Sequence, residues 1–185
     1  MFFCNKLEMH QLSEIERILE DYNDFQKGVI YKKPGDASPE LDPKRRSDIC
    51  WVNDDRLKSF ITSLFKNANR EYFGFNLGGG GVWDVQYTKY ISEDLGYYDW
   101  HPDQYLHSLG NRQYQRKLSI TIQLSNPEEY EGGEFLLDGA DLDQDILKQK
   151  GRFIIFPSLY RHKVCPVTKG KRLSLVSWYE GPRWQ

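Results

Sequence analysis

The stretch from Tyr98 to Asp103 has the sequence Tyr-Asp-Trp-His-Pro-Asp, and it holds two side chains of types that bind metals in many proteins. In an extended segment, side chains alternate between the two faces, so His101 and Asp103 point the same way. One short segment therefore offers an imidazole and a carboxylate side by side. A His-x-Asp spacing also arises by chance, so on its own it fits a polar pair in a surface loop equally well.

A third ligand must come from elsewhere, and His162 is the candidate. It follows the apolar run from Phe153 to Pro157, which predicts a buried strand that ends in a turn. Two histidines and one carboxylate can form the facial triad of non-haem Fe(II) oxygenases, which leaves three metal positions open. Zinc on the same ligands would favour hydrolysis instead. The alternative for His162 is a histidine that caps the end of a strand.

Arg172 begins an alternating segment in which residues 172, 174 and 176 share one face. If that face points inward, the guanidinium needs an anion, and its planar fork of donors binds a carboxylate bidentately. 2-Oxoglutarate is such an anion, because its keto acid end chelates iron while its distal carboxylate can reach Arg172. The alternative is an exposed strand arginine in the basic run from Lys169 to Arg172.

Several motifs of this chain together resemble the Fe(II)/2-oxoglutarate-dependent dioxygenase superfamily, and within it the prolyl 4-hydroxylase-like group that includes the PKHD-type hydroxylases. The motifs are Lys89-Tyr90, Tyr98 to Asp103, Leu118 to Ser125, Tyr130 to Phe135, Phe156 to Ser158 and His162 to Arg172. The resemblance covers roughly residues 82 to 179, about half of the chain, whereas residues 1 to 75 carry no motif that can be placed.

The resemblance implies roles for individual residues. The implied iron ligands are His101, Asp103 and His162, and Arg172 is implied to hold the distal carboxylate of 2-oxoglutarate. The implied hydroxyl partners of the same carboxylate are Tyr98 and Ser119, with Tyr90 as a further candidate. The span from Tyr90 to His101 is slightly longer than is usual in the family, and prolyl hydroxylases proper commonly carry Lys at the position of Arg172. The second departure favours the PKHD-type branch.

The implied activity is hydroxylation of an unactivated C–H bond that depends on Fe(II), 2-oxoglutarate and O2, with ascorbate as the expected reductant. A prolyl residue in a peptide or protein is the favoured substrate. Three alternatives stay open: an oxygenase that acts on another side chain or a small molecule, a non-catalytic jelly-roll module that binds a metal or ligand, and a zinc hydrolase.

Composition sets further expectations. The 185 residues are 39% hydrophobic and 15% aromatic, which suits a single domain over 1–185. A formal net charge of −2 provides no basic field for nucleic acid, so no nucleic-acid partner is expected. Three separated cysteines without a CxxC pair favour a reducing compartment. With no signal peptide and no membrane-spanning stretch, the expected location is cytoplasmic, while the oligomeric state stays open.

Periodicity predicts two helices followed by many short strands. Apolar spacing indicates a helix over 12–22 with a Ser13–Glu16 capping box, and a second helix over 53–72 with Asn53 as N-cap. The strands are expected over 82–91, 97–101, 117–125, 133–137, 152–156, 162–167 and 172–179. This pattern predicts a mainly β fold with flanking helices, and the resemblance implies a double-stranded β-helix (jelly roll, cupin-like). Residues 1–75 are expected to form helical support and a loop, and residues 82–179 the jelly-roll core.

Two loops, 27–48 and 104–116, are candidate substrate clamps. In the first, the run Lys44-Arg45-Arg46 is expected to be a solvated face, with contact to an acidic substrate or partner as the alternative. In the second, His107 is expected at the surface, with the substrate entrance as the alternative. Gly132 and Gly133 are expected to permit positive φ near the site, with a hairpin turn between solvated glutamates as the alternative. Trp178 is expected in the core, with closure of the pocket near the iron as the alternative.

Overall fold

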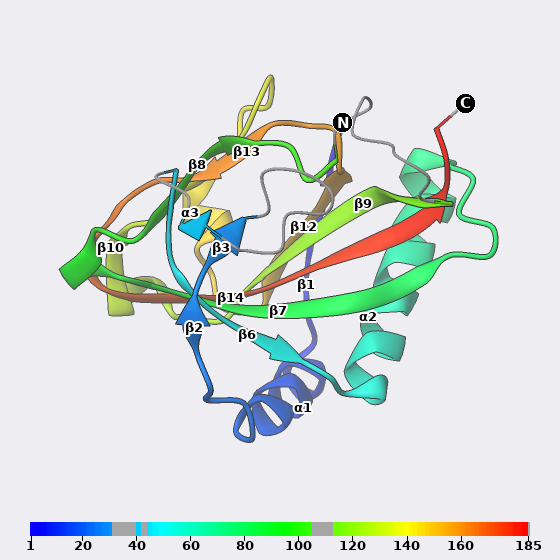
Figure 1. The fold of residues 1–185 in the computed structure, drawn as a ribbon. Coiled ribbons are helices and arrows are strands. Elements are labelled where there is room, and N and C mark those ends of the chain that lie inside the picture. The colour runs from blue at the N-terminus through cyan, green and yellow to red at the C-terminus, as the bar shows by residue number, and fades with distance from the viewer. Residues whose placement is uncertain (31–39, 42–43, 105–112, 185) are drawn as a thin grey trace.

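The structure, a computed structural model, describes residues 1–30, 40–41, 44–104 and 113–184 (Figure 1). Two antiparallel sheets form the body of the molecule, and Figure 1 shows the strands of the smaller one lying across the larger. The larger sheet contains β1 (Phe3–Lys6), β12 (Arg152–Pro157), β9 (Tyr114–Gln123), β14 (Val167–Pro182), β7 (Gly81–Ile91), β6 (Asp48–Val52) and β2 (Gln26–Lys27) in that order, with β10 (Tyr130–Gly132) paired to β14. The smaller sheet contains β11 (Phe135–Leu137), β13 (His162–Val164), β8 (Tyr97–His101) and β5 (Arg45–Arg46). A separate two-stranded pair is formed by β3 (Val29–Ile30) and β4 (Glu40–Leu41).

This arrangement confirms the predicted mainly β fold with flanking helices. Each strand expected after residue 80 is present, although β9 begins earlier than expected, β13 ends earlier and β14 begins five residues sooner. The predictions missed the strands of the N-terminal part. β1, β2 and β6 join the larger sheet and β5 joins the smaller, so the region 27–48 is not simply an irregular loop where the structure describes it.

Two helices cover the outer face of the larger sheet, α1 (Met9–Leu19) and α2 (Asp55–Ala68). Their apolar stripes, which include Ile15 and Phe65, share one core with the outward-facing residues of β9. In β9, Leu118, Ile120 and Ile122 belong to that helix-side core. Strand alternation therefore turns the residues between them toward the other sheet.

Both predicted helix starts are shifted. The N-cap of α2 is Asp54 rather than Asn53, because the Asp54 carboxylate accepts from the backbone N–H of Leu57 at 2.9 Å. At α1, the side chain of Gln11 accepts from the backbone N–H of Glu8 at 2.9 Å, so the predicted Ser13–Glu16 box is wrong. A π-helical turn, η1 (Asn69–Phe73), continues α2, and two 3-10 turns, η2 (Ser92–Asp94) and η3 (Pro127–Glu129), and the short helix α3 (Gln144–Leu147) lie in connections.

The second core lies between the two sheets and is bordered by buried polar groups. Its apolar part includes Phe135 and Val164 of the smaller sheet and Ile154 and Phe156 of the larger. Buried polar side chains lie on the inward face of the larger sheet: Thr88 on β7, Ser119 and Gln123 on β9, and Arg172 and Ser174 on β14. A buried polar lining of this kind indicates a binding site rather than a purely structural core.

Gly132 and Gly133 have φ of 76° and 64°, as predicted. A Cβ on Gly132 would lie 2.2 Å from the carbonyl oxygen of Pro166, so the close approach of β10 to the chain before β14 requires glycine there. Within the described ranges, no helix has the length and apolar character needed to cross a membrane.

Candidate metal centre

Three of the predicted donors meet between the sheets. His101 ends β8, His162 begins β13, and the two are direct partners across these antiparallel strands. Nε2 of His101 lies 3.8 Å from Oδ1 of Asp103, and Nε2 of His162 lies 3.5 Å from Oδ2. One ligand atom from each residue lies within 4.8 Å of the others. An octahedral ion about 2.1 Å from each donor needs neighbouring donors about 3 Å apart, so small adjustments suffice for a metal ion to bind.

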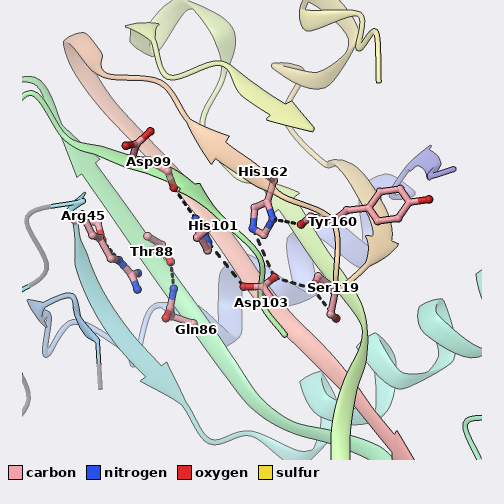
Figure 2. Close-up of polar contacts among 11 residues, drawn as sticks. Arg45, Gln86, Thr88, Asp99, His101, Asp103, Ser119, Tyr160 and His162 are labelled. Carbon is pink, nitrogen blue, oxygen red and sulfur yellow. Dashed lines mark hydrogen bonds and ion pairs between the residues drawn. The ribbon is translucent and has the colours of Figure 1, made fainter. Parts of the chain in front are cut away.

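Each imidazole is oriented by the backbone carbonyl two residues before it (Figure 2). Nδ1 of His101 donates to the carbonyl oxygen of Asp99 at 2.7 Å, and Nδ1 of His162 donates to that of Tyr160 at 3.1 Å. A carbonyl oxygen only accepts, so Nδ1 carries the proton in each ring and Nε2 presents its lone pair. This is the tautomer that metal-binding histidines need.

The Asp103 carboxylate is held from the neighbouring strands. The hydroxyl of Ser119 donates to Oδ2 of Asp103 at 2.7 Å, and it lies 2.9 Å from the hydroxyl of Ser158. The carbonyl oxygen of Ser158 also accepts from the backbone N–H of Asp103 at 2.9 Å. Ser119 was predicted to contact 2-oxoglutarate, but its hydroxyl is directed to the metal-side carboxylate.

The charges of the three donors suit a cation. Burial alone would raise the pKa of the Asp103 carboxyl, but His162, His101, Arg116 and the Ser119 hydrogen bond outweigh burial and lower this pKa. Burial, followed by the charge of His162, lowers the pKa of His101 to about 4. Near neutral pH the structure thus offers an ionised carboxylate and a neutral His101 imidazole.

Arg172 lies inside the molecule, with only 4% of its surface exposed. Its guanidinium donates to the hydroxyl of Ser174 at 3.4 Å, a long contact, and lies 5.6 Å from the ring of its cross-strand partner Tyr90. None of the described carboxylates forms an ion pair with it, and the nearby Glu134 pairs with Lys148 at 2.7 Å. A buried guanidinium without an anion is costly, so this end of the pocket fits a ligand carboxylate.

The two candidate tyrosines lie in different places. Tyr90 is buried beside Arg172, and burial raises the pKa of its hydroxyl, which therefore stays a neutral donor. Tyr98 instead stacks on the imidazole of His101, with ring centres 3.5 Å apart. Tyr90 is thus the better placed of the two for a ligand bound by Arg172, while Tyr98 supports a metal donor.

Aromatic and cationic groups lie next to the contact between Ser119 and Asp103. Trp178 is the cross-strand partner of Ser119, and the guanidinium of Arg116 lies 3.7 Å from its ring centre. Trp51 lies 6.5 Å from Trp178 and is half exposed. The indole N–H of Trp178 is buried and has no acceptor among the described residues. His107, predicted near here, lies outside the described residues, as does most of the loop 104–116.

The sequence analysis missed three groups at this site. Ser158 belongs to the motif from Phe156 to Ser158, but no role was predicted for it. Arg116 is the last residue of the loop 104–116, and nothing in the sequence around it indicated a role. Arg45 was expected to be solvated with Lys44 and Arg46, and that prediction is wrong, because Arg45 is buried beside Tyr98.

Known proteins that resemble this chain support the same kind of site. The sequence profile of the 2OG-Fe(II) oxygenase superfamily matches residues 85–180, more than half of the chain. The chain belongs to the 2OG-Fe(II) oxygenase superfamily. Its cofactors are by that membership Fe(II), 2-oxoglutarate and oxygen, and the donor set together with Arg172 lies inside the matched range.

Among curated relatives, a PKHD-type hydroxylase from Acidovorax ebreus (strain TPSY) is 34% identical over 101 residues, which are 54% of this chain and 44% of that protein. This supports the resemblance to PKHD-type hydroxylases. The matched stretch covers between 28% and 44% of the length of the curated relatives, so the chain spans less than half of each.

Solved structures of the same fold cover nearly the whole chain. A viral collagen prolyl hydroxylase from Paramecium Bursaria Chlorella virus-1 has a TM-score of 0.67 at 18% identity, over 97% of this chain and 96% of that one. A prolyl hydroxylase from Trichoplax adhaerens, in complex with a hypoxia inducible factor peptide fragment, has a TM-score of 0.66 at 18% identity, over 96% and 82%. At this identity the likeness shows the fold alone, and it confirms the double-stranded β-helix.

Proposed function

We propose that this chain is an Fe(II)- and 2-oxoglutarate-dependent dioxygenase that hydroxylates a prolyl residue in a peptide or protein. The observation that carries the proposal is the pairing of a His-Asp-His donor set with a buried guanidinium that forms no ion pair with any described carboxylate. A metal site alone would fit many functions, but this second feature calls for a carboxylate ligand in the same pocket. 2-Oxoglutarate offers both a chelating end and a distal carboxylate.

In this proposal His101, Asp103 and His162 hold the metal, and Arg172 and Tyr90 hold the distal carboxylate. When bound, Fe(II) and 2-oxoglutarate activate oxygen, so that one oxygen atom enters a C–H bond of the substrate and the other converts 2-oxoglutarate to succinate with release of carbon dioxide. The protein supplies geometry: carbonyl oxygens fix the imidazole tautomers, and Ser119 holds the carboxylate oxygen. The chemistry is assigned to the jelly-roll core 82–179, with residues 1–75 as support within a single domain over 1–185.

The prolyl part rests on names of related proteins. The curated relatives are PKHD-type hydroxylases. Two of the structural neighbours are prolyl hydroxylases, and one of these is in complex with a peptide fragment. A peptide needs an open approach to the metal, and the half-exposed ring of Trp51, 6.5 Å from the buried Trp178, provides apolar surface for such a chain.

The reaction is tested by incubating the protein with Fe(II), 2-oxoglutarate, ascorbate and air, with and without a panel of proline-containing peptides. We expect succinate release and a mass gain of one oxygen atom on a prolyl residue. Succinate without any modified peptide would point to another side chain or a small molecule. No succinate from the Fe(II)-loaded protein would favour a non-catalytic module, and hydrolysis with zinc that ignores 2-oxoglutarate would favour a hydrolase.

The anchor is tested separately with Arg172→Gln. Loss of a charge-assisted contact should raise the 2-oxoglutarate concentration for half-maximal succinate release about 10- to 100-fold. Lys171→Gln is the matched control, since the neighbouring side chain is exposed and points to the opposite face of β14. An Arg172→Gln protein with the wild-type requirement would remove the anchor assignment.

A further inference from the structure

Arg45 is a second buried arginine close to the metal site. Strand β5 pairs with β8, so that Arg45 lies opposite Tyr98 and Arg46 opposite Tyr97. Alternation along the strand turns Arg45 inward, where it is 9% exposed, and leaves Arg46 exposed. The sequence gives no reason to treat these two adjacent arginines differently, but the pairing with β8 separates them.

The Arg45 guanidinium is enclosed but incompletely satisfied. Its Nε donates to the hydroxyl of Ser47 at 2.7 Å, and a Cβ on Gly28 would lie only 2.6 Å from that nitrogen. Among the described residues, its buried Nη2 has no hydrogen-bond partner and no carboxylate pairs with the guanidinium. Burying a charged donor without a partner is costly, so its persistence indicates an acceptor that arrives with a ligand.

The Arg45 guanidinium packs against the tyrosine ring that stacks on one of the metal donors. Its central carbon lies 4.7 Å from the ring centre of Tyr98, and that ring stacks at 3.5 Å on the imidazole of His101. Figure 2 shows Arg45 pointing from β5 toward Gln86 and Thr88 of β7, two buried polar residues on the inward face. By these two distances, 4.7 Å and 3.5 Å, the charge lies no more than about 8 Å from the ring centre of His101.

The charged side chains around the metal site indicate that the missing ligand is an anion. Arg45 and Arg172 are buried and Arg116 is half-buried beside Trp178, whereas Asp103 is the buried carboxylate of the donor set. In the proposed function, the two charges of Fe(II) and that of Arg172 offset Asp103 and the two carboxylates of 2-oxoglutarate. The charges of Arg45 and Arg116 then remain without a counter-ion among the described residues. Arg116 is partly exposed to solvent, so Arg45 is the buried one of the two, and a substrate that brings a carboxylate would relieve it.

We propose that Arg45 binds a carboxylate of the substrate, carried on the hydroxylated residue or on the residue beside it, and thereby selects such substrates. The inference rests on the proposed function, since it takes the pocket to be an oxygenase site. Two sources share this chemistry, the α-carboxylate of a C-terminal prolyl residue and the side chain of an adjacent acidic residue. A guanidinium fork binds either one with two parallel hydrogen bonds.

The test measures binding without turnover. Wild-type protein, Arg45→Gln, Arg45→Lys and the control Arg46→Gln are loaded with Fe(II) and 2-oxoglutarate without oxygen and titrated calorimetrically. The probes for the first source are N-acetylproline and N-acetylprolinamide. For the second source they are acetyl-Glu-Pro-amide and acetyl-Gln-Pro-amide. We expect the acid of one pair to bind wild type about tenfold or more tightly than its neutral counterpart.

In Arg45→Gln this preference should vanish, and in Arg46→Gln it should persist. Arg45→Lys should keep a reduced preference, and it replaces the Gln variant if that variant does not fold. The proposal is overturned if the wild type prefers neither acid, and failure to bind any probe counts as no preference. It is also overturned if Arg45→Gln keeps the full preference. Where that variant does not fold, an undiminished preference in Arg45→Lys overturns the proposal. Titration with 2-oxoglutarate alone distinguishes failure of the Arg45 proposal from failure of the proposed function. If the wild type does not bind 2-oxoglutarate, the proposed function is contradicted. Loss of 2-oxoglutarate binding in Arg45→Gln would assign Arg45 to the co-substrate instead.

Discussion

Lowering the pH should destabilise the metal-free protein through His101. Burial and the charge of His162 lower the pKa of this imidazole from 6.5 to about 4 in the folded protein. Between these values the unfolded chain binds a proton that the folded chain does not. The contribution of His101 to stability is therefore complete above pH 6.5 and is lost as the pH falls toward 4. With 1.36 kcal/mol for each unit of pKa difference, the loss is about 2 kcal/mol between pH 7 and pH 5 and about 3 kcal/mol by pH 4.

The assay is urea unfolding of wild type and His101→Asn from pH 7 to pH 4 in the presence of a chelator. Carboxyl groups distant from residue 101 titrate alike in both proteins, so the difference between the two free energies of unfolding reports His101 together with its coupling to Asp103 and His162. The free energy of unfolding of the wild type minus that of His101→Asn should fall by about 2 kcal/mol from pH 7 to pH 5. Parallel pH dependence in the two proteins would refute the reasoning, since it would mean that the imidazole is not desolvated as its burial implies.

Two further outcomes follow from the geometry. Ser119→Ala removes the hydroxyl that donates to Asp103. It should raise the dissociation constant of the metal about tenfold or more, measured by competition with a chelator. An unchanged dissociation constant would mean that Asp103 is held without the Ser119 hydroxyl. Gly132→Ala should lower the free energy of unfolding by about 2–4 kcal/mol, because φ is 76° and the new Cβ would meet the carbonyl oxygen of Pro166. Gly139→Ala is its control: at φ 70° with nothing within 4 Å, it should lose only about 1 kcal/mol for the backbone conformation. Equal losses in the two glycine variants would contradict the steric argument.

Much of the fold could be predicted because its signals are local. Alternation in β9 distinguishes Leu118 and Ile120, which pack under the helices, from Ser119, which faces the site. The helix starts moved by a few residues because neighbouring polar side chains compete as caps, and the sequence does not determine whether Asn53 or Asp54 accepts from Leu57.

The partners of side chains across the fold could not be predicted in the same way. Ser119 was assigned to a co-substrate, yet its hydroxyl reaches Asp103, because the chain after β8 is held against Ser158 and crosses above β9. The strand β5 is only two residues long, too short to show periodicity. Its pairing with β8, and with it the burial of Arg45, depends on contacts far apart in the sequence.

The donor set shows how local and distant order combine. Each histidine is oriented by the carbonyl two residues before it, Asp99 for His101 and Tyr160 for His162, so the tautomer is fixed within each strand end. The register between β8 and β13 then makes the two rings cross-strand partners, with ring centres 4.3 Å apart. A shift of one residue in either strand would turn one imidazole to the outer face of the sheet. The local hydrogen bonds thus prepare two ligands, and strand pairing makes them a single site.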